Sequence, residues 1–401
     1  ASAADLNTLN GKTSVNVDAS SITAITSSTA DAVNTAVTNI SAIGLDGDWD
    51  VTLSDTTLSA AEVKTINAAT SGTINMSAAT TISSSSISNI LEIVQNTGAT
   101  FATAGNYAVT LSDTTASAAN IKLINADSSG AIDMSAVTTI SSSSISDILE
   151  IVQDTGAAFT TASNYAVTLS DTSASAANIK LINDDSSGAI NMSAVATITS
   201  SSLSDVLEIV NNTNAAFTTA TDYAVTISGT ISAANANTIM GDTSGIVTAT
   251  VTATGAVADL NTALSNAASN DALTLVLNAT SASASDLNSL NGKTSVNIDA
   301  ATITAITSST ADDVNTAVTN KTAIGLDSDF NVTLSDTTLS AAEVKTINAG
   351  TSGLIDMSAA TTISSSAIAD VLEIVQNTGA AFATQSGYNV TLSDTSASAA
   401  D

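Results

Sequence analysis

The chain has 401 residues, with 37 acidic side chains against seven lysines, and its formal net charge is −30. It contains no cysteine, histidine, proline or arginine. This composition excludes disulfides, the usual zinc and copper sites, and Ser-His-Asp or Cys-His catalytic relays. The excess of acidic groups repels phosphate, which argues against a nucleic-acid partner.

Hydrophobic residues make up 44% of the chain, mostly Ala, Val, Ile and Leu, so the composition is not that of a disordered protein. We expect no membrane span, because no apolar run reaches about 18 residues. The opening sequence ASAADLNTLN lacks the charged and apolar regions of a signal peptide. It begins inside the repeat pattern described next, so we expect the chain to be part of a longer array.

One motif, VTLSDTTLSAAEVKTIN at residues 51–67, recurs along the chain. Close copies begin at Val109, Val167 and Val332, and a shortened copy begins at Val390. The first three copies are 58 residues apart, as are the last two, and repetition on this scale predicts an array of similar units.

A longer period of 281 residues is superimposed, so that residues 282–401 repeat residues 1–120. Lys12 is matched by Lys293 and Trp49 by Phe330. The unit at about residues 227–282 is shorter and has lost the Asp and Lys of the other units. We interpret this degenerate unit as a bend or seam, and the whole chain, residues 1–401, as a single continuous solenoid.

Each 58-residue unit contains two halves of about 29 residues. Extended segments such as 107–113 and 131–141 are rich in Val, Ile and Thr and predict strands. Segments 117–125 and 144–153 have apolar residues spaced as on one face of a helix, and Ser, Thr or Asp precedes them as a potential N-cap. The sequence therefore predicts an α/β fold, a right-handed solenoid of stacked strand–helix coils with one continuous parallel β-sheet.

Five aspartates recur at the end of the LSDT segment and are the main candidate site residues: Asp55, Asp113, Asp171, Asp336 and Asp394. An aspartate here can cap a helix by accepting hydrogen bonds from its free N–H groups. Alternatively, these aspartates could be calcium ligands, although Ca²⁺ takes six to eight oxygens and each position supplies one carboxylate. We favour caps, expect no required cofactor, and keep calcium as the alternative.

Other residue types also recur once per unit. We expect the lysines to neutralise nearby acids on a solvated helix face, and the aromatic and methionine side chains to fill the core. These residues are Lys64, Lys122, Lys180 and Lys345; Phe101, Phe159, Phe217 and Phe382; Tyr107, Tyr165, Tyr223 and Tyr388; and Met76, Met134, Met192 and Met357. Threonine and serine tracts such as residues 247–255 could order water or carry O-linked glycans, which the sequence leaves open.

The repeat SAADLNTLNGKTSVNVDASSITAITSSTADAVNTAV resembles those of very large secreted surface proteins of bacteria, especially cyanobacteria, described as hemolysin-like, S-layer or adhesin proteins exported by type I machinery. Their glycine-rich calcium nonapeptide is absent, since the chain contains no Gly-Gly. The resemblance implies an extracellular, cell-surface protein of a coat, sheath or fibre.

We therefore expect a non-enzymatic structural protein of an extracellular filament, sheath or surface layer, which associates with itself through repeated contacts. The alternative is a rigid stalk of a giant secreted adhesin. A polysaccharide-cleaving enzyme of the β-helix type is the third hypothesis. We find no phosphate-binding loop, no dinucleotide fingerprint and no distinctive pair of acidic residues.

Overall fold

The structure is a computed structural model, and it describes residues 1–397. It is an α/β protein with parallel-strand sheets, and sixteen helices lie within the described residues. The final residues of the predicted 282–401 repeat lie outside the described part. None of the helices in residues 1–397 is long and apolar enough to cross a bilayer.

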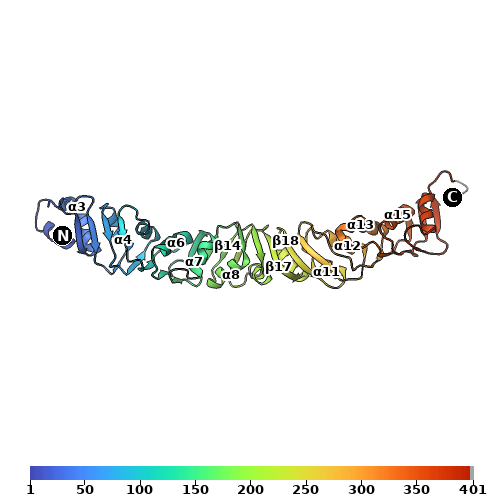
Figure 1. Ribbon diagram of the computed structural model, residues 1–401, viewed down its shortest axis with the longest axis horizontal. Helices are drawn as coiled ribbons and strands as arrows, with labels where there is room; N and C mark the ends of the chain where they lie inside the picture. Colours follow the sequence, from blue (N-terminus) through green and yellow to red (C-terminus); the bar gives the residue numbers. More distant parts are fainter. Residues whose placement is uncertain (398–401) are drawn as a thin grey trace. The chain divides into compact units, whose positions relative to one another are not determined.

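The chain forms two compact units. Figure 1 labels several of their helices and strands. Unit 1 comprises residues 1–196 and 211–220, and unit 2 comprises residues 197–210 and the chain from residue 221 onward. In both, strands alternate with helices of about eight to ten residues. We call the stretch from one such helix to the next a repeat segment.

The helices of unit 1 are α1 (Ala3–Asn10), α2 (Ala30–Thr38), α3 (Ile40–Ile43), α4 (Ala60–Asn67), α5 (Ile87–Val94), α6 (Ala118–Asp127), α7 (Ile145–Val152) and α8 (Ala176–Asp185). Its strands are β1 (Ala24–Ser28), β2 (Asp50–Leu53), β3 (Thr57–Leu58), β4 (Thr73–Asn75), β5 (Thr81–Ser85), β6 (Thr100–Ala102), β7 (Ala108–Leu111), β8 (Thr115–Ser117), β9 (Ile132–Met134), β10 (Thr139–Ser143), β11 (Phe159–Thr161), β12 (Ala166–Leu169), β13 (Ser173–Ser175), β14 (Ile190–Met192) and β16 (Phe217–Thr219).

The helices of unit 2 are α9 (Leu203–Val210), α10 (Ala233–Asp242), α11 (Val257–Ala263), α12 (Ala284–Asn291), α13 (Ala311–Thr319), α14 (Lys321–Ile324), α15 (Ala341–Gly350) and α16 (Ile368–Val375). Its strands are β15 (Thr197–Ser201), β17 (Ala224–Ser232), β18 (Val247–Ala253), β19 (Ala272–Leu277), β20 (Ser281–Ala282), β21 (Ala305–Ser309), β22 (Asn331–Leu334), β23 (Thr338–Ser340), β24 (Ile355–Met357), β25 (Thr362–Ser366), β26 (Phe382–Thr384) and β27 (Asn389–Leu392).

The strands do not form the one continuous sheet that the sequence predicted. Fourteen of the fifteen strands of unit 1 form three parallel sheets, with the orders β1-β2-β4-β6, β3-β5-β7-β9-β11 and β8-β10-β12-β14-β16. The second and third sheets begin 58 residues apart, at Thr57 and Thr115, and overlap along the sequence. A new sheet begins in each 58-residue repeat. A short loop, such as Ser112–Thr114, interrupts the strand after four residues and offsets the strand pairing that follows.

Each repeat segment buries a few aliphatic side chains between its strands and its helix. Helix α7 buries Ile145, Ile148 and Ile151, each worth roughly 1.5–3 kcal/mol when fully removed from water. The recurrent methionines are buried, as predicted, and so are Tyr107, Tyr165 and Tyr223. The four recurrent phenylalanines and Tyr388 are only half-buried, so the aromatic prediction holds only for three tyrosines.

Glycines recur where one repeat segment approaches the backbone of the next. A Cβ atom at Gly130 would lie 2.2 Å from the carbonyl oxygen of Tyr107. The neighbouring Ser128 Oγ donates to that same oxygen at 2.6 Å, which fixes the approach. A Cβ atom at Gly130 would therefore clash with backbone, and no side-chain rotation could relieve that clash.

We predict that Gly130→Ala lowers the free energy of unfolding by about 1–3 kcal/mol, because the added methyl group forces two backbones apart. Gly47→Ala is the matched control, since a Cβ there meets nothing within 4 Å. The urea midpoints of both variants and the wild type measure the effect. Equal midpoints for the two variants would contradict the close approach.

Candidate functional site

Consecutive repeat segments are joined by side chains that cap helices across the boundary between segments. Asp113, in the loop after strand β7, accepts a hydrogen bond from the backbone N–H of Ile87, the first residue of α5, at 2.7 Å. The other four candidate aspartates make the same contact with a helix 25 or 26 residues upstream: Asp55 with Ala30, Asp171 with Ile145, Asp336 with Ala311 and Asp394 with Ile368, all at 2.7–2.8 Å. Each aspartate therefore caps the helix of the preceding repeat segment.

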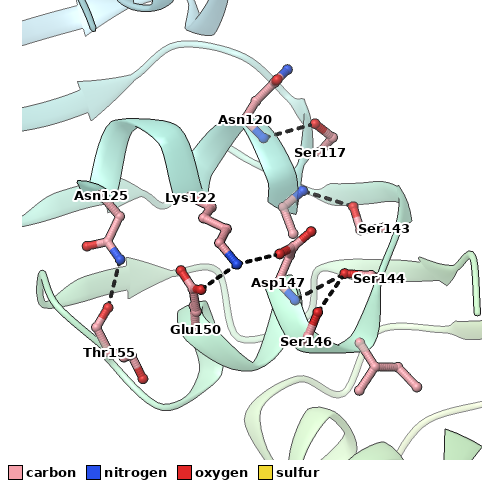
Figure 2. Close-up of polar contacts among 12 residues, drawn as sticks. Ser117, Asn120, Lys122, Asn125, Ser143, Ser144, Ser146, Asp147, Glu150 and Thr155 are labelled. Atoms are coloured by element: carbon pink, nitrogen blue, oxygen red, sulfur yellow. Dashed lines mark hydrogen bonds and ion pairs between the residues drawn. The ribbon is translucent and has the colours of Figure 1, made fainter. Parts of the chain in front are cut away.

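Serines make the equivalent contact in the alternate segments. Ser143 Oγ accepts from the backbone N–H of Ala118, at the start of α6, at 2.9 Å (Figure 2). Ser28, Ser85, Ser309 and Ser366 accept from Ala3, Ala60, Ala284 and Ala341 at 2.8 Å. We call this series of aspartate and serine contacts the cap ladder.

Most of these helices also have a cap from their own segment. The side chain of Ser117 accepts from the N–H of Asn120 in α6, and Ser144 accepts from the N–H of Asp147 in α7 (Figure 2). The local serine satisfies the third N–H, and the cap ladder satisfies the first. The ladder thus supplies a partner for an N–H group that no intrahelical bond can reach.

The other end of each helix carries a second contact to the following segment. Asn125, in the last turn of α6, donates to the carbonyl oxygen of Thr155 at 2.7 Å and accepts from the N–H of Ala157 at 2.8 Å. Asn67, Asn183 and Asn348 hold the equivalent turns in the same way. Gly156 fits there because its φ is +92° and a Cβ would lie 2.8 Å from Asn125 Oδ1.

Ion pairs join the exposed faces of neighbouring helices. Lys122 Nζ lies 2.9 Å from Asp147 and 2.8 Å from Glu150, both on α7 (Figure 2). Glu150 and Asp147 raise the pKa of Lys122 to about 12, and Lys122 in turn lowers the pKa of Asp147. Lys64 and Lys345 pair with acids on the next helix, and Lys180 pairs with Asp184 on its own helix.

The buried tyrosines add a further contact. Tyr107 donates its hydroxyl hydrogen to Asp127 at 2.6 Å, and Tyr165 and Tyr223 make the same bond to Asp185 and Asp242. Burial, followed by the neighbouring carboxylate, raises the pKa of each tyrosine. These hydroxyls therefore stay protonated and act as hydrogen-bond donors.

The degenerate unit lacks several of these contacts. Gly229 stands where Asp113 stands in the regular repeat, and the first N–H of α9, at Leu203, has no cap-ladder partner among the described residues. The same is true of the first N–H groups of α10 and α11, at Ala233 and Val257, within residues 1–397. A cavity of about 480 Å³ lies in this part of unit 2 and is lined by polar residues that include Asp242, Asn266 and Asp271.

The carboxylate of Asp271 takes the place of a backbone carbonyl acceptor that the regular repeats use. It is only 3% exposed and accepts hydrogen bonds from the N–H groups of Val247 and Ala268 at 2.9 Å. In regular units the N–H equivalent to that of Val247, at Ile132, donates instead to the carbonyl oxygen of Ala158. Both carboxylate oxygens of Asp271 are thus committed to the fold.

The sequence pointed to the aspartates but not to their partners. Cap-ladder contacts join residues about 25 positions apart, and no local pattern indicates which helix each carboxylate meets. The asparagine contacts were missed, although Asn67, Asn125, Asn183 and Asn348 recur in phase. Within residues 1–397, no three Asp or Glu side chains come together as a group that could hold a metal ion.

We predict that Asp113→Ala lowers the free energy of unfolding by about 1 kcal/mol, because the first N–H of α5 loses its partner. Asp46→Ala, at an exposed loop aspartate, is the control and should change little. Urea unfolding should be measured in calcium and in a chelator. A loss seen only in calcium would identify Asp113 as a ligand and contradict its role as a cap.

The Lys122 ion pairs predict a pH dependence. The lowered pKa of Asp147 contributes stability that is present above its unfolded value of about 3.9 and is lost as pH falls through the folded value. The raised pKa of Lys122 contributes stability below about 10.4 that is lost as pH rises through about 12. The difference in urea midpoint between wild type and Lys122→Met should therefore shrink in acid, and a difference that is constant with pH would refute the coupling.

Comparison of the chain with protein-family models, with curated proteins and with solved structures gave no match. A function for this chain therefore has to be argued from its own residues and from the contacts between its repeat segments.

Proposed function

We propose that this chain is a non-enzymatic structural protein of an extracellular filament, sheath or surface layer. Its repeat segments stack as the coils of a right-handed α/β solenoid. The observation that carries the proposal is the cap ladder, in which a side chain of one segment completes the helix of the segment before it. The recurrent polar groups that a binding site would need are used to hold neighbouring segments together.

The proposed right-handed turn is the one that connections of this kind favour. Parallel strands joined through a helix are almost always connected by a right-handed crossover. Strands β5, β7 and β9 pair in parallel, and helices α5 and α6 lie between them in the sequence. A succession of such crossovers in one direction is a right-handed solenoid.

The energetics favour an array over separate domains. Each ladder contact contributes about 0.5–2 kcal/mol, and each asparagine adds two hydrogen bonds of about 0.5–1.5 kcal/mol. These terms exist only when the next segment is present. The stability of such an array is a sum of segment and boundary terms, so length is gained without a new core.

The surface chemistry fits a long extracellular object. A net charge of −30 keeps such a chain soluble, and exposed serine and threonine hydroxyls are potential sites of glycan attachment. The extracellular location rests on the resemblance to secreted bacterial surface proteins. Self-association into a layer or filament would use contacts repeated from unit to unit, whereas a stalk of a giant adhesin would stay single.

Electron microscopy of the purified chain by negative stain, over a range of salt and calcium concentrations, tests the proposal. We expect ordered filaments or sheets under at least one ionic condition, because like-charge repulsion between copies is screened by salt. Analytical ultracentrifugation under the same conditions provides the control. Monomers alone under every condition would refute assembly and favour the stalk.

A further inference from the structure

We draw no further inference here: the strongest candidate, the polar cavity of about 480 Å³ beside Asp242 and Asp271 in unit 2, rests on two carboxylates that already accept hydrogen bonds within the fold, and nothing in the structure shows what would fill it.

Discussion

The structure depends on a hydrogen bond between segments about 25 residues apart, from the first N–H of a helix to a side chain of the following segment. A helix leaves its first N–H groups without intrahelical partners, and short helices are marginal in water. Here each of the ten helices joined by the ladder obtains its partner from the next segment, through Asp113 or its counterparts in one half of each unit and Ser143 or its counterparts in the other. Helix formation and the association of segments are thereby coupled, and that coupling accounts for the strict recurrence of Asp and Ser in the sequence.

Local patterns were enough to predict the α/β class, the parallel strands, the short helices and the burial of the methionines. They failed where pairing between segments decides the outcome. Alternation in YAVTLSD predicts a strand, but the offset created at Ser112–Thr114, which starts a new sheet in each unit, becomes visible only when β7 and β9 are paired. The aspartates were recognised as candidate caps because of their chemistry. Asn125 was missed because its two partners lie 30 and 32 residues away, beyond any local pattern.

The degenerate repeat at about residues 227–282 shows how the fold differs where cap-ladder contacts are missing. Where Gly229 replaces aspartate, the first N–H of α9 loses its ladder partner, and β17 continues to Ser232 with a register shift against β18 between Thr226 and Thr230. In this part of unit 2 fewer helices are joined by the cap ladder, while strands β17, β18 and β19 are longer than those of the regular repeats. A structural protein with such a repeat has one place where neighbouring segments are joined mainly by strand pairing.

Residue-resolved hydrogen exchange of the wild-type chain tests the cap ladder most directly. The first N–H of a helix normally exchanges fast, because it has no intrahelical partner. The account predicts that the amides of Ile87, Ala118 and Ile145 are protected as strongly as the interior of their helices, and that those of Leu203, Ala233 and Val257 exchange much faster. Equal exchange rates in the two sets would contradict the claim that contacts between segments hold this molecule together.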